Sequence, residues 1–298
     1  MKKLLAIVLT CVTAAATLAG CGSKEAGTSG SKQTKVIDVD LTSEEYAFGV
    51  DKTQPELLEK VNEFIEEIKT NGTFDEICDR YFGSGTPEGV QSAALDESKD
   101  QLVVATNAAF EPFEYMQGES YYGIDMEIAA ALADYLGKEL VIQNMDFDAV
   151  CLSVGQQKCD IAMAGLTIKE DRKEYVDFSN PYYSASQRLI VMADDTDFDD
   201  CKSAEDVEAK LNEKAAEGGV KIGVQNGTTG QFYVEGDESW GFAGISAAEC
   251  VPYKNGSLAV QDLINGNIKY VIIDSAPAKC ITEAINKMQS VKAKTERY

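Results

Sequence analysis

The stretch Ile161-Ala-Met-Ala-Gly-Leu-Thr-Ile-Lys-Glu-Asp-Arg172 decides the fold of this chain. Its apolar run ends at Ala164, which predicts a buried strand that opens into a loop. Thr167 is expected to N-cap the next helical turn, with Glu170 three residues on as in a capping box, and Arg172 in that turn. A hydroxyl, free amide N–H groups and a guanidinium therefore converge at a strand end, an arrangement that favours a bound carboxylate.

Five further motifs accompany this stretch: Val103-Val-Ala-Thr-Asn-Ala-Ala-Phe-Glu-Pro-Phe113, Gly123-Ile-Asp-Met-Glu127, Met145-Asp-Phe147, Gly223-Val-Gln-Asn-Gly-Thr-Thr-Gly230 and Val271-Ile-Ile-Asp274. In this order and spacing they resemble the polar amino-acid family of bacterial solute-binding proteins, the extracytoplasmic partners of ABC importers. The resemblance covers nearly all of the chain beyond residue 35. It implies an α/β, two-lobe periplasmic-binding-protein fold (type II), in which two Rossmann-like lobes are joined by a two-strand hinge.

The order of the family's segments is broken in one place. Stretches that resemble the family's C-terminal end come first here: Leu41-Thr-Ser-Glu-Glu-Tyr-Ala-Phe-Gly-Val50, Pro55-Glu-Leu-Leu-Glu-Lys60, Asn71-Gly-Thr-Phe-Asp-Glu-Ile77 and Tyr81-Phe-Gly83. We interpret this as a circular permutation, in which residues 84–101 join the family's original ends. Permutation is tolerated where chain ends lie close together at the surface. The alternative interpretation is a chance match of a helical tail.

Residues 1–20 are expected to be a lipoprotein signal peptide. The first residues are positively charged, and the apolar run from Leu4 to Leu18 is too short for a stable membrane span. Leu18-Ala-Gly-Cys21 matches the lipobox of bacterial lipoproteins, which implies a lipid on Cys21 that anchors the chain to the cell membrane. An ordinary signal peptide with an incidental cysteine is the alternative. The polar composition of residues 21–35 predicts a flexible tether.

The composition excludes several classes of function. The 298 residues include 27 Lys and Arg but 50 Asp and Glu, for a net charge of −23, so nucleic acid is not an expected partner. The chain has no His and no C-x-x-C, which argues against a zinc site and against His-activated nucleophiles. We expect no metal and no cofactor, and a monomer. Six cysteines follow Cys21, and their spacing indicates no disulfide framework.

Strand and helix patterns alternate along the chain, which predicts parallel sheets covered by helices. Strands are expected at 102–106, 139–143, 160–164, 187–193, 220–224, 249–253 and 270–273, and helices at 55–69, 125–136, 148–156, 204–215, from 229, 257–264 and 276–287. By the resemblance, strands near 46–50 and 188–192 are the hinge crossings. The expected lobe 1 is residues 43–191, including the linker 84–101, and the expected lobe 2 is residues 36–42 plus 192–298.

The motifs place charged and hydroxyl groups at strand ends, where ligands bind in open α/β sheets. The resemblance implies that Arg172 grips the α-carboxylate of a free L-amino acid, helped by the N–H and hydroxyl of Thr167. It implies that Thr228 and Thr229 close on the same carboxylate from lobe 2. It also implies that Asp274 is the counter-ion of the α-ammonium group. From the residues alone, Arg172 is also compatible with a surface helix, and Asp274 with the N-cap of the next helix.

Small residues at the end of the central strand complete this part of the expected site. The resemblance implies that the carbonyl of Gly165 shares the ammonium group with the acidic residue. Ala164 leaves space for the ligand beside it. Phe113 is expected to pack in the core rather than to face the ligand.

The ligand side chain is expected to meet aromatic and amide groups. By resemblance, Phe110 and Phe147 match aromatic positions that sandwich the ligand. Asn107 matches a position that is often Asp in relatives that bind cationic or amide side chains, so an uncharged Asn favours a polar or neutral amino acid such as glutamine. Gln225 adds a second amide from lobe 2. Glu114 would reverse this preference if its carboxylate reached the pocket.

These observations predict a lipid-anchored receptor that binds a free amino acid between two lobes and delivers it to an ABC permease. The ligand would dock on lobe 1, and hinge closure would then bring lobe 2 onto it. One alternative is an enzyme on the same scaffold, dehydratase- or lyase-like, which would need a positioned acid or base beyond the charged clamp. The other is an amino-acid-sensing lipoprotein.

Overall fold

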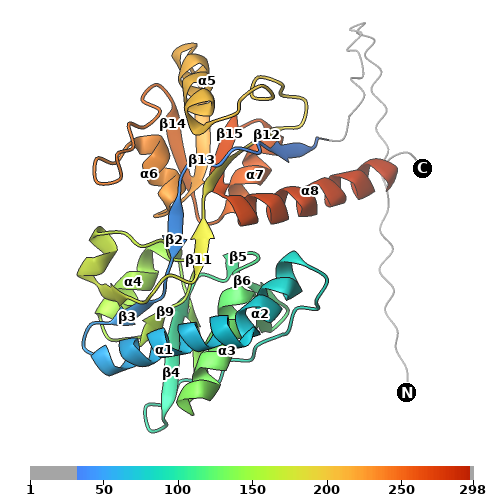
Figure 1. Cartoon of the computed structure of the whole chain (residues 1–298). Helices are drawn as coiled ribbons and strands as arrows, with labels where there is room; N and C mark the ends of the chain where they lie inside the picture. The colour runs from blue at the N-terminus through green and yellow to red at the C-terminus, as the bar shows by residue number, and fades with distance from the viewer. Residues whose placement is uncertain (1–31, 296–298) are drawn as a thin grey trace, which may run out of the picture. The chain divides into compact units, whose positions relative to one another are not determined.

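Two five-stranded sheets organise residues 32–295, which are the residues that the computed structural model describes, into two lobes (Figure 1). The sheet of lobe 1 has the order β10 (Val176–Phe178), β3 (Gly49–Asp51), β9 (Ile161–Ala162), β4 (Gln101–Thr106), β8 (Glu139–Asn144). The sheet of lobe 2 has the order β1 (Thr34–Val36), β12 (Gln187–Met192), β15 (Tyr270–Asp274), β13 (Lys221–Gln225), β14 (Glu249–Tyr253). The predicted two-lobe α/β fold is confirmed.

Two strands cross between the lobes side by side. β2 (Glu44–Tyr46) enters lobe 1 and β11 (Tyr183–Ala185) leaves it, and the two pair in antiparallel fashion (Figure 1). The crossing expected at residues 188–192 is wrong, because these residues lie inside β12 of the lobe 2 sheet. Their apolar run, Leu-Ile-Val, fills a buried strand. The boundary expected at residue 191 therefore lies before β12.

The sequence predicted parallel sheets, but both sheets are mixed. In lobe 1, β4 runs parallel to β8 and β9, whereas β3 runs antiparallel to β9 and β10. In lobe 2, β13 runs parallel to β14 and β15, whereas β12 is antiparallel to β1 and β15. β3 and β12 are the strands that run against the others of their sheets, and they directly follow the crossing strands β2 and β11. They enter each sheet from the hinge end, so they run opposite to the strands of the βαβ units.

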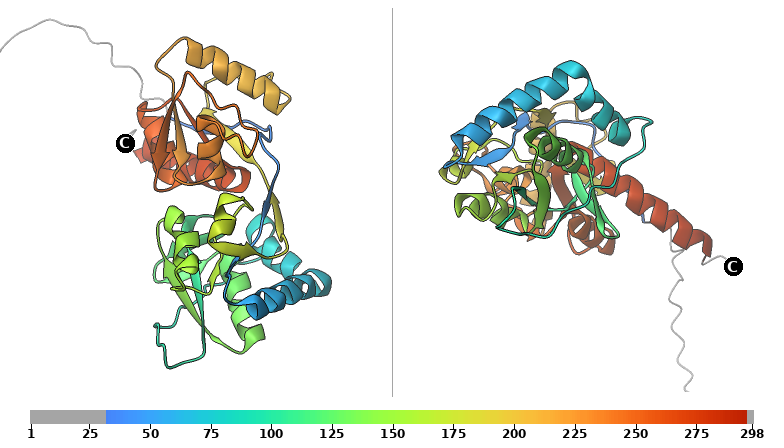
Figure 2. Two further views of the ribbon diagram at one scale, coloured as in Figure 1. Left: turned by 90° about the vertical axis from the view of Figure 1, so that its left-hand side faces the viewer. Right: turned by 90° about the horizontal axis from the view of Figure 1, so that it is seen from below.

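Helices cover both faces of the lobe 1 sheet. They are α1 (Pro55–Asn71), α2 (Thr73–Phe82), α3 (Ile124–Leu136) and α4 (Phe147–Gly155), with α1 and α4 on opposite sides (Figure 2). The alternation of β4 explains this: Leu102 and Val104 join the apolar cluster of α1 and α3, whereas Val103 and Ala105 join that of α4.

The sequence of α1 shows why it forms where it does. Pro55 is at its start, where the missing N–H costs nothing, and Gly72 ends it with a left-handed φ of 89°. Its buried residues recur at helical spacing. They are Leu57, Val61, Phe64, Ile65 and Ile68.

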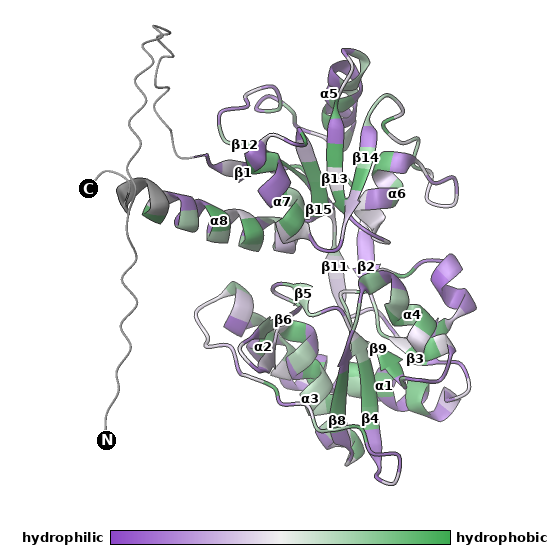
Figure 3. Cartoon of the chain, turned by 180° about the vertical axis from the view of Figure 1, so that it is seen from behind, coloured by the Kyte–Doolittle hydropathy of each residue, from purple (hydrophilic) through white to green (hydrophobic). Residues whose placement is uncertain are grey.

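Lobe 2 repeats this layering with α5 (Ala204–Ala216), α6 (Thr229–Glu235), α7 (Gly256–Asn265) and α8 (Ser275–Thr295). In β15, Val271 and Ile273 face α7 and α8, whereas Tyr270 and Ile272 face α5 and α6. Figure 3 shows β4 and β15 as largely apolar strands between their helices. A capping box formed by Ser203 and Asp206 fixes the start of α5.

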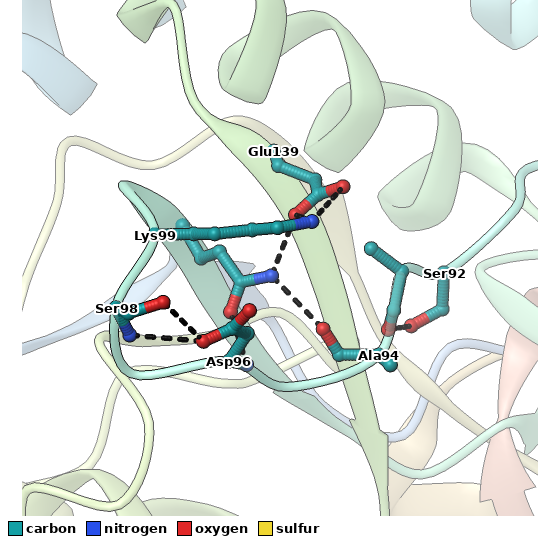
Figure 4. A network of polar contacts seen from close by, with 8 residues as sticks. Ser92, Ala94, Asp96, Ser98, Lys99 and Glu139 are labelled. Atoms are coloured by element: carbon teal, nitrogen blue, oxygen red, sulfur yellow. Dashed lines mark hydrogen bonds and ion pairs between the residues drawn. The ribbon is translucent and has the colours of Figure 1, made fainter.

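The segment that precedes β4 lies along the free edge of lobe 1. The N–H of Ala93 donates to the carbonyl of Leu140 at 2.9 Å, and the N–H of Ile142 donates to the hydroxyl of Ser92 at 2.8 Å. Lys99 and Glu139 pair next to it (Figure 4). Within residues 84–101, the stretch around Ser92 and Ala93 thus lies against the edge strand β8, whose backbone groups would otherwise be unpaired there, whereas most of the other residues of this segment are exposed.

Several expectations concern the ends of the chain. The predicted signal peptide (1–20) and Cys21 lie outside the described residues. The tether expected to reach residue 35 ends earlier, because β1 begins at Thr34 and pairs with β12. Within residues 32–295, no helix is long and apolar enough to cross a membrane. The cysteines of this part of the chain are free thiols.

Candidate binding site

One small cavity between the lobes is lined by most of the residues selected from the sequence. Lobe 1 contributes Phe110, Phe147, Gly165, Thr167 and Arg172, and lobe 2 contributes Gln225, Thr228, Thr229 and Asp274. The cavity volume is only about 10 Å³, roughly the space that one water molecule requires. An amino acid therefore fits only if the lobes separate or side chains rotate. A larger cavity of about 600 Å³ lies beside the 84–101 segment, on lobe 1 alone.

The two remaining predicted residues lie next to this cavity. The Oδ1 atom of Asn107 accepts a hydrogen bond from Nε2 of Gln225 at 3.1 Å, and its Nδ2 donates to the carbonyl of Met145 at 2.6 Å. These bonds join the two amides across the lobes. Ala164 is buried in the core cluster that packs against α4. Its role in leaving space for a ligand stays a prediction.

Arg172 lies on a single 3-10 turn rather than in an α-helix. The turn η1 covers Asp171–Glu174. One guanidinium nitrogen of Arg172 donates to the carbonyl of Thr167 at 2.6 Å, and the other donates to the carbonyl of Gly227 in lobe 2 at 3.0 Å. The guanidinium also lies 5.2 Å from the centre of the Phe147 ring. Its donors are thus fixed at the point where the lobes meet.

The expected capping box of Thr167 and Glu170 is wrong. Glu170 itself precedes η1 and no side chain caps the turn. The hydroxyl of Thr167 instead donates to Oε2 of Glu44 at 2.8 Å. The reason is tertiary: the crossing strand β2 pairs with this loop through Tyr46 and Thr167, which brings Glu44 beside the hydroxyl.

Asp274 ends β15 and is buried, with 4 % of its surface exposed. The hydroxyl of Tyr46 donates to its Oδ1 atom. Burial and the nearby charge of Glu44 raise the pKa of Asp274 to about 7. Because α8 begins at Ser275, the N-cap position and a charged role at the cavity are compatible.

The residues around Asp274 were missed in the sequence. Gln187 lies opposite Asp274 in the β12–β15 pairing, and its Nε2 atom donates to Oε1 of Glu44 at 3.0 Å. Glu44 and Tyr46 are both buried and point to the same side of β2. This buried-exposed-buried alternation was the available signal, but nothing local indicated which groups the strand would meet.

The loop between β13 and α6 is closed on itself. The hydroxyl of Thr228 donates to the carbonyl of Gln225 at 2.8 Å, and the N–H of Gly227 donates to Oε1 of Gln231 at 2.8 Å. The N–H of Thr228 also points to that Gln225 carbonyl, at 3.4 Å. In this arrangement the donors of Thr228, expected to hold a carboxylate, are engaged within the loop. Gly227 has a left-handed φ of 74° that favours glycine.

Two buried acids lie behind the cavity in lobe 1. Asp125 accepts the N–H of Gly165 at 2.8 Å and the hydroxyl of Tyr182 at 2.6 Å, so it positions the loop after β9. Burial raises the pKa of Asp125 to about 7. The motif Gly123-Ile-Asp-Met-Glu127 was recognised in the sequence, but this role of Asp125 was not predicted from it.

Glu114 does not line the cavity. It belongs to the small sheet β5 (Ala109–Phe110), β6 (Glu114–Gln117), β7 (Ser120–Tyr122), directly opposite Phe110. It is fully buried, both carboxyl oxygens have no partner among the described residues, and burial raises its pKa well above the usual range. Phe113 beside it is fully buried against Tyr46 and Tyr183, as expected for packing.

The fold is that of a two-lobed protein, and the cavity between its lobes is lined by Arg172 from lobe 1 and Asp274 from lobe 2. The sequence model of the bacterial extracellular solute-binding proteins, family 3, matches residues 10–84 and 102–290. The chain belongs to this family. The family resemblance inferred from the sequence motifs is confirmed.

Three known proteins illustrate the similarity. The chain is 34% identical over 106 residues to the arginine-binding extracellular protein ArtP of Bacillus subtilis, covering 36% of this chain and 42% of that one. It is 29% identical over 174 residues to a probable histidine-binding protein of Neisseria gonorrhoeae, covering 58% of each. The matches thus span less than two thirds of these relatives. The named relatives are binding proteins.

A solved structure supports the fold. The ancestral amino acid-binding protein AncCDT-1, described as a precursor of cyclohexadienyl dehydratase, superimposes with a TM-score of 0.52 and 29% identity. The superposition covers 71% of this chain and 78% of that one.

Proposed function

We propose that this chain is an extracytoplasmic receptor that binds a free amino acid between its lobes and delivers it to an ABC importer. The observation that carries the proposal is the meeting of opposite charges at one cavity: Arg172 from lobe 1 and Asp274 from lobe 2. A free amino acid is a zwitterion, so its carboxylate and ammonium groups match these two side chains. The names of the relatives, which bind arginine, histidine and cystine, support the same class of ligand.

Ligand capture requires the lobes to open. With the lobes together, the guanidinium of Arg172 donates to the backbone of Thr167 and Gly227. When lobe 2 moves away, the bond to Gly227 is lost and a ligand carboxylate takes its place. Closure then brings Asp274 to the ammonium group. The ligand stabilises the closed arrangement by as much as it binds that arrangement more tightly than the open one.

The amide pair of Asn107 and Gln225 supports a polar or neutral ligand side chain. Both residues are uncharged, and the Oε1 atom of Gln225 has no protein partner among the described residues. The pair therefore offers hydrogen-bond donors and an acceptor but no charge, which suits an uncharged polar ligand side chain such as that of glutamine. Phe110 and Phe147, which line the cavity, would pack against its methylene groups.

A thermal-shift screen of the twenty amino acids tests this function. A ligand at 100 times its Kd adds about 2.7 kcal/mol to stability, so we expect one or a few amino acids to raise the Tm by several degrees. Polar and neutral amino acids should give the largest rise in Tm. If arginine or lysine gave the largest rise, the proposed side-chain preference would be wrong but the proposed function would stand. If none of the twenty amino acids raised the Tm but a sugar or a phosphorylated compound did, the proposed function would be contradicted.

The anchoring of the receptor rests on Cys21. We infer that a lipid on this residue holds the chain at the outer face of the cell membrane, close to its permease. The lipobox Leu18-Ala-Gly-Cys21 supports this inference. The Cys21→Ser variant is expected to appear in the medium rather than in the membrane fraction. Retention of that variant in the membrane would contradict lipid anchoring.

We also infer that the family's order is circularly permuted in this chain. The chain passes from lobe 2 through lobe 1 and back to lobe 2, with α1 and α2 placed before β4. The family match is divided into residues 10–84 and 102–290. Residues 85–101, which lie between the two matched parts, correspond to the expected linker.

Proteolytic cleavage tests the linker interpretation. Residues 95–99 form an exposed turn, whereas Ala93 and Ser92 are bonded to β8. A single cut in this turn is expected to leave two fragments that elute together and still show the ligand-induced Tm shift, because the fragments share the lobe 1 core. Separation of the fragments or loss of the shift after that one cut would contradict a linker role. A cut engineered into β11, which joins the lobes, is the matched control and should abolish the shift.

A further inference from the structure

Lys169 is an unusual lysine because its side chain is only 4 % exposed. It follows the loop of Thr167 in lobe 1, three residues before Arg172. Its ammonium group lies 2.9 Å from Oδ2 of Asp171 in lobe 1 and 2.9 Å from Oδ2 of Asp237 in lobe 2. The ammonium group is also 3.5 Å from the centre of the Phe232 ring, on α6. Burying a charged lysine costs free energy unless the ammonium group is paired in this way.

The lobe 2 side of this contact is rigidly held. The Oδ1 atom of Asp237 accepts the N–H of Ser239 at 2.9 Å and its hydroxyl at 2.5 Å. The backbone of Asp237 pairs with that of Phe242. The Ser239 hydrogen bonds and Lys169 lower the pKa of Asp237 to about 2, so the carboxylate stays charged. Lys169 therefore meets a carboxylate that is held by hydrogen bonds, together with the aromatic face of Phe232.

The other contacts between the lobes differ in kind. Lys254 and Asp146 form an ion pair at 3.3 Å, but their side chains are 75 % and 62 % exposed. Exposed pairs of this kind contribute little to stability. The bonds of Arg172 to Gly227 and of Gln225 to Asn107 lie at the cavity itself. Lys169 does not line that cavity and is shielded from water.

We propose that Lys169 is a positioning residue that latches the two lobes together by inserting its ammonium group between Asp171, Asp237 and Phe232. It joins the loop that carries Arg172 to helix α6, which begins at Thr229, so closing the latch aligns the two halves of the binding site. The latch sets the balance between open and closed forms without touching the ligand. Because a captured ligand is held only while the lobes are closed, the latch sets how long the ligand stays bound and so tunes affinity from outside the site.

The test compares Lys169→Met with Lys254→Met in the full chain. Methionine keeps the length of the lysine stem and removes the charge. We expect Lys169→Met to increase the ligand-free radius of gyration in small-angle X-ray scattering and to raise the dissociation rate of the amino acid found in the screen about tenfold, because affinity changes act mostly on dissociation. Lys254→Met, the exposed control, should match the wild type in both measurements.

Asp237→Asn is the second variant and guards against misfolding of the first. It preserves the bonds from Ser239 but removes the lobe 2 anion, so it should reproduce the opening and the faster dissociation. Wild-type scattering and dissociation in both variants would overturn the latch, as would equal effects of Lys254→Met. The latch deepens the proposed function, but the scattering measurement needs no ligand. A chain that opens in Lys169→Met yet binds no amino acid would therefore support the latch and contradict the proposed function.

Discussion

The Arg172→Ala variant is expected to lose amino-acid binding almost completely. Arg172 is the cation that lines the cavity from lobe 1, and its two donors already point at oxygen atoms there. Removing one partner of a buried charged pair typically costs about 2–5 kcal/mol, so the Kd should rise between roughly 30-fold and several thousand-fold. Isothermal titration with the amino acid found in the thermal-shift screen measures this change.

Two variants separate the role of the guanidinium from that of charge. Arg172→Lys keeps the positive charge but not the planar fork, and it should bind more weakly than the wild type and more tightly than Arg172→Ala. Lys173→Ala removes a neighbouring cation on the same turn, which forms an ion pair with Glu170 and is 44 % exposed. It should bind like the wild type. An unchanged Kd in Arg172→Ala would remove the central element of the proposed function.

Much of the site could be predicted because its residues follow buried strands. The apolar runs of β9, β13 and β15 are visible in the sequence; Gly165 and Thr228 follow the first two, and Asp274 is the last residue of the third. Strand ends of parallel units meet at one edge of a sheet, so Thr228 and Asp274 of lobe 2 could be placed together without knowing any contact. The resemblance to the family brought Gly165 of lobe 1 to the same site. Helix α1 of lobe 1 could also be predicted, because its apolar residues recur at helical spacing.

The remaining features depend on partners far away in the chain. The hydroxyl of Thr167 meets Glu44, 123 residues away, and this contact replaces the expected capping box. Lys169 meets Asp237, 68 residues away. A local pattern carries no information on such pairs, because they arise only when the crossing strands bring the lobes together. The hinge was misplaced for a related reason: β11 is three residues long and only partly buried, so its pattern is weak.

The pH dependence of ligand affinity is expected to follow Asp274. Its pKa of about 7 means that it is partly protonated near neutral pH. A protonated carboxyl cannot serve as the counter-ion of an ammonium group. The Kd should therefore rise as the pH falls from 8 to 5, approaching tenfold per pH unit once the pH is below about 7. Titration calorimetry across this range measures it, and an accompanying proton release on binding should appear in buffers of different ionisation enthalpy.

The Asp274→Asn variant should change binding and stability in opposite directions. It removes the partner of the ammonium group, so binding should be weak and nearly independent of pH. Because burial raises the pKa of Asp274 above its unfolded value, the wild-type carboxyl contributes stability that is present at low pH and is lost as the pH rises through about 7. Each unit of that shift corresponds to about 1.4 kcal/mol.

The ligand-free variant should therefore have a higher Tm than the wild type at pH 8, and this difference should shrink as the pH falls and vanish only near pH of about 4, where the Asp side chain of the unfolded chain also becomes protonated. Asp125 and Glu114, whose pKa values are also raised by burial, are unchanged in the variant, so part of the pH dependence of stability remains. Asp100→Asn, at an exposed ion pair with Lys138, is the control and should leave both binding and stability unaltered. Binding that stays at wild-type strength in Asp274→Asn would show that the ammonium group is held elsewhere. A lower Tm of Asp274→Asn at pH 8 would contradict this interpretation, because it would mean that the charge of Asp274 stabilises the fold. A carboxylate that serves binding at a cost in stability should instead raise the Tm when it is replaced.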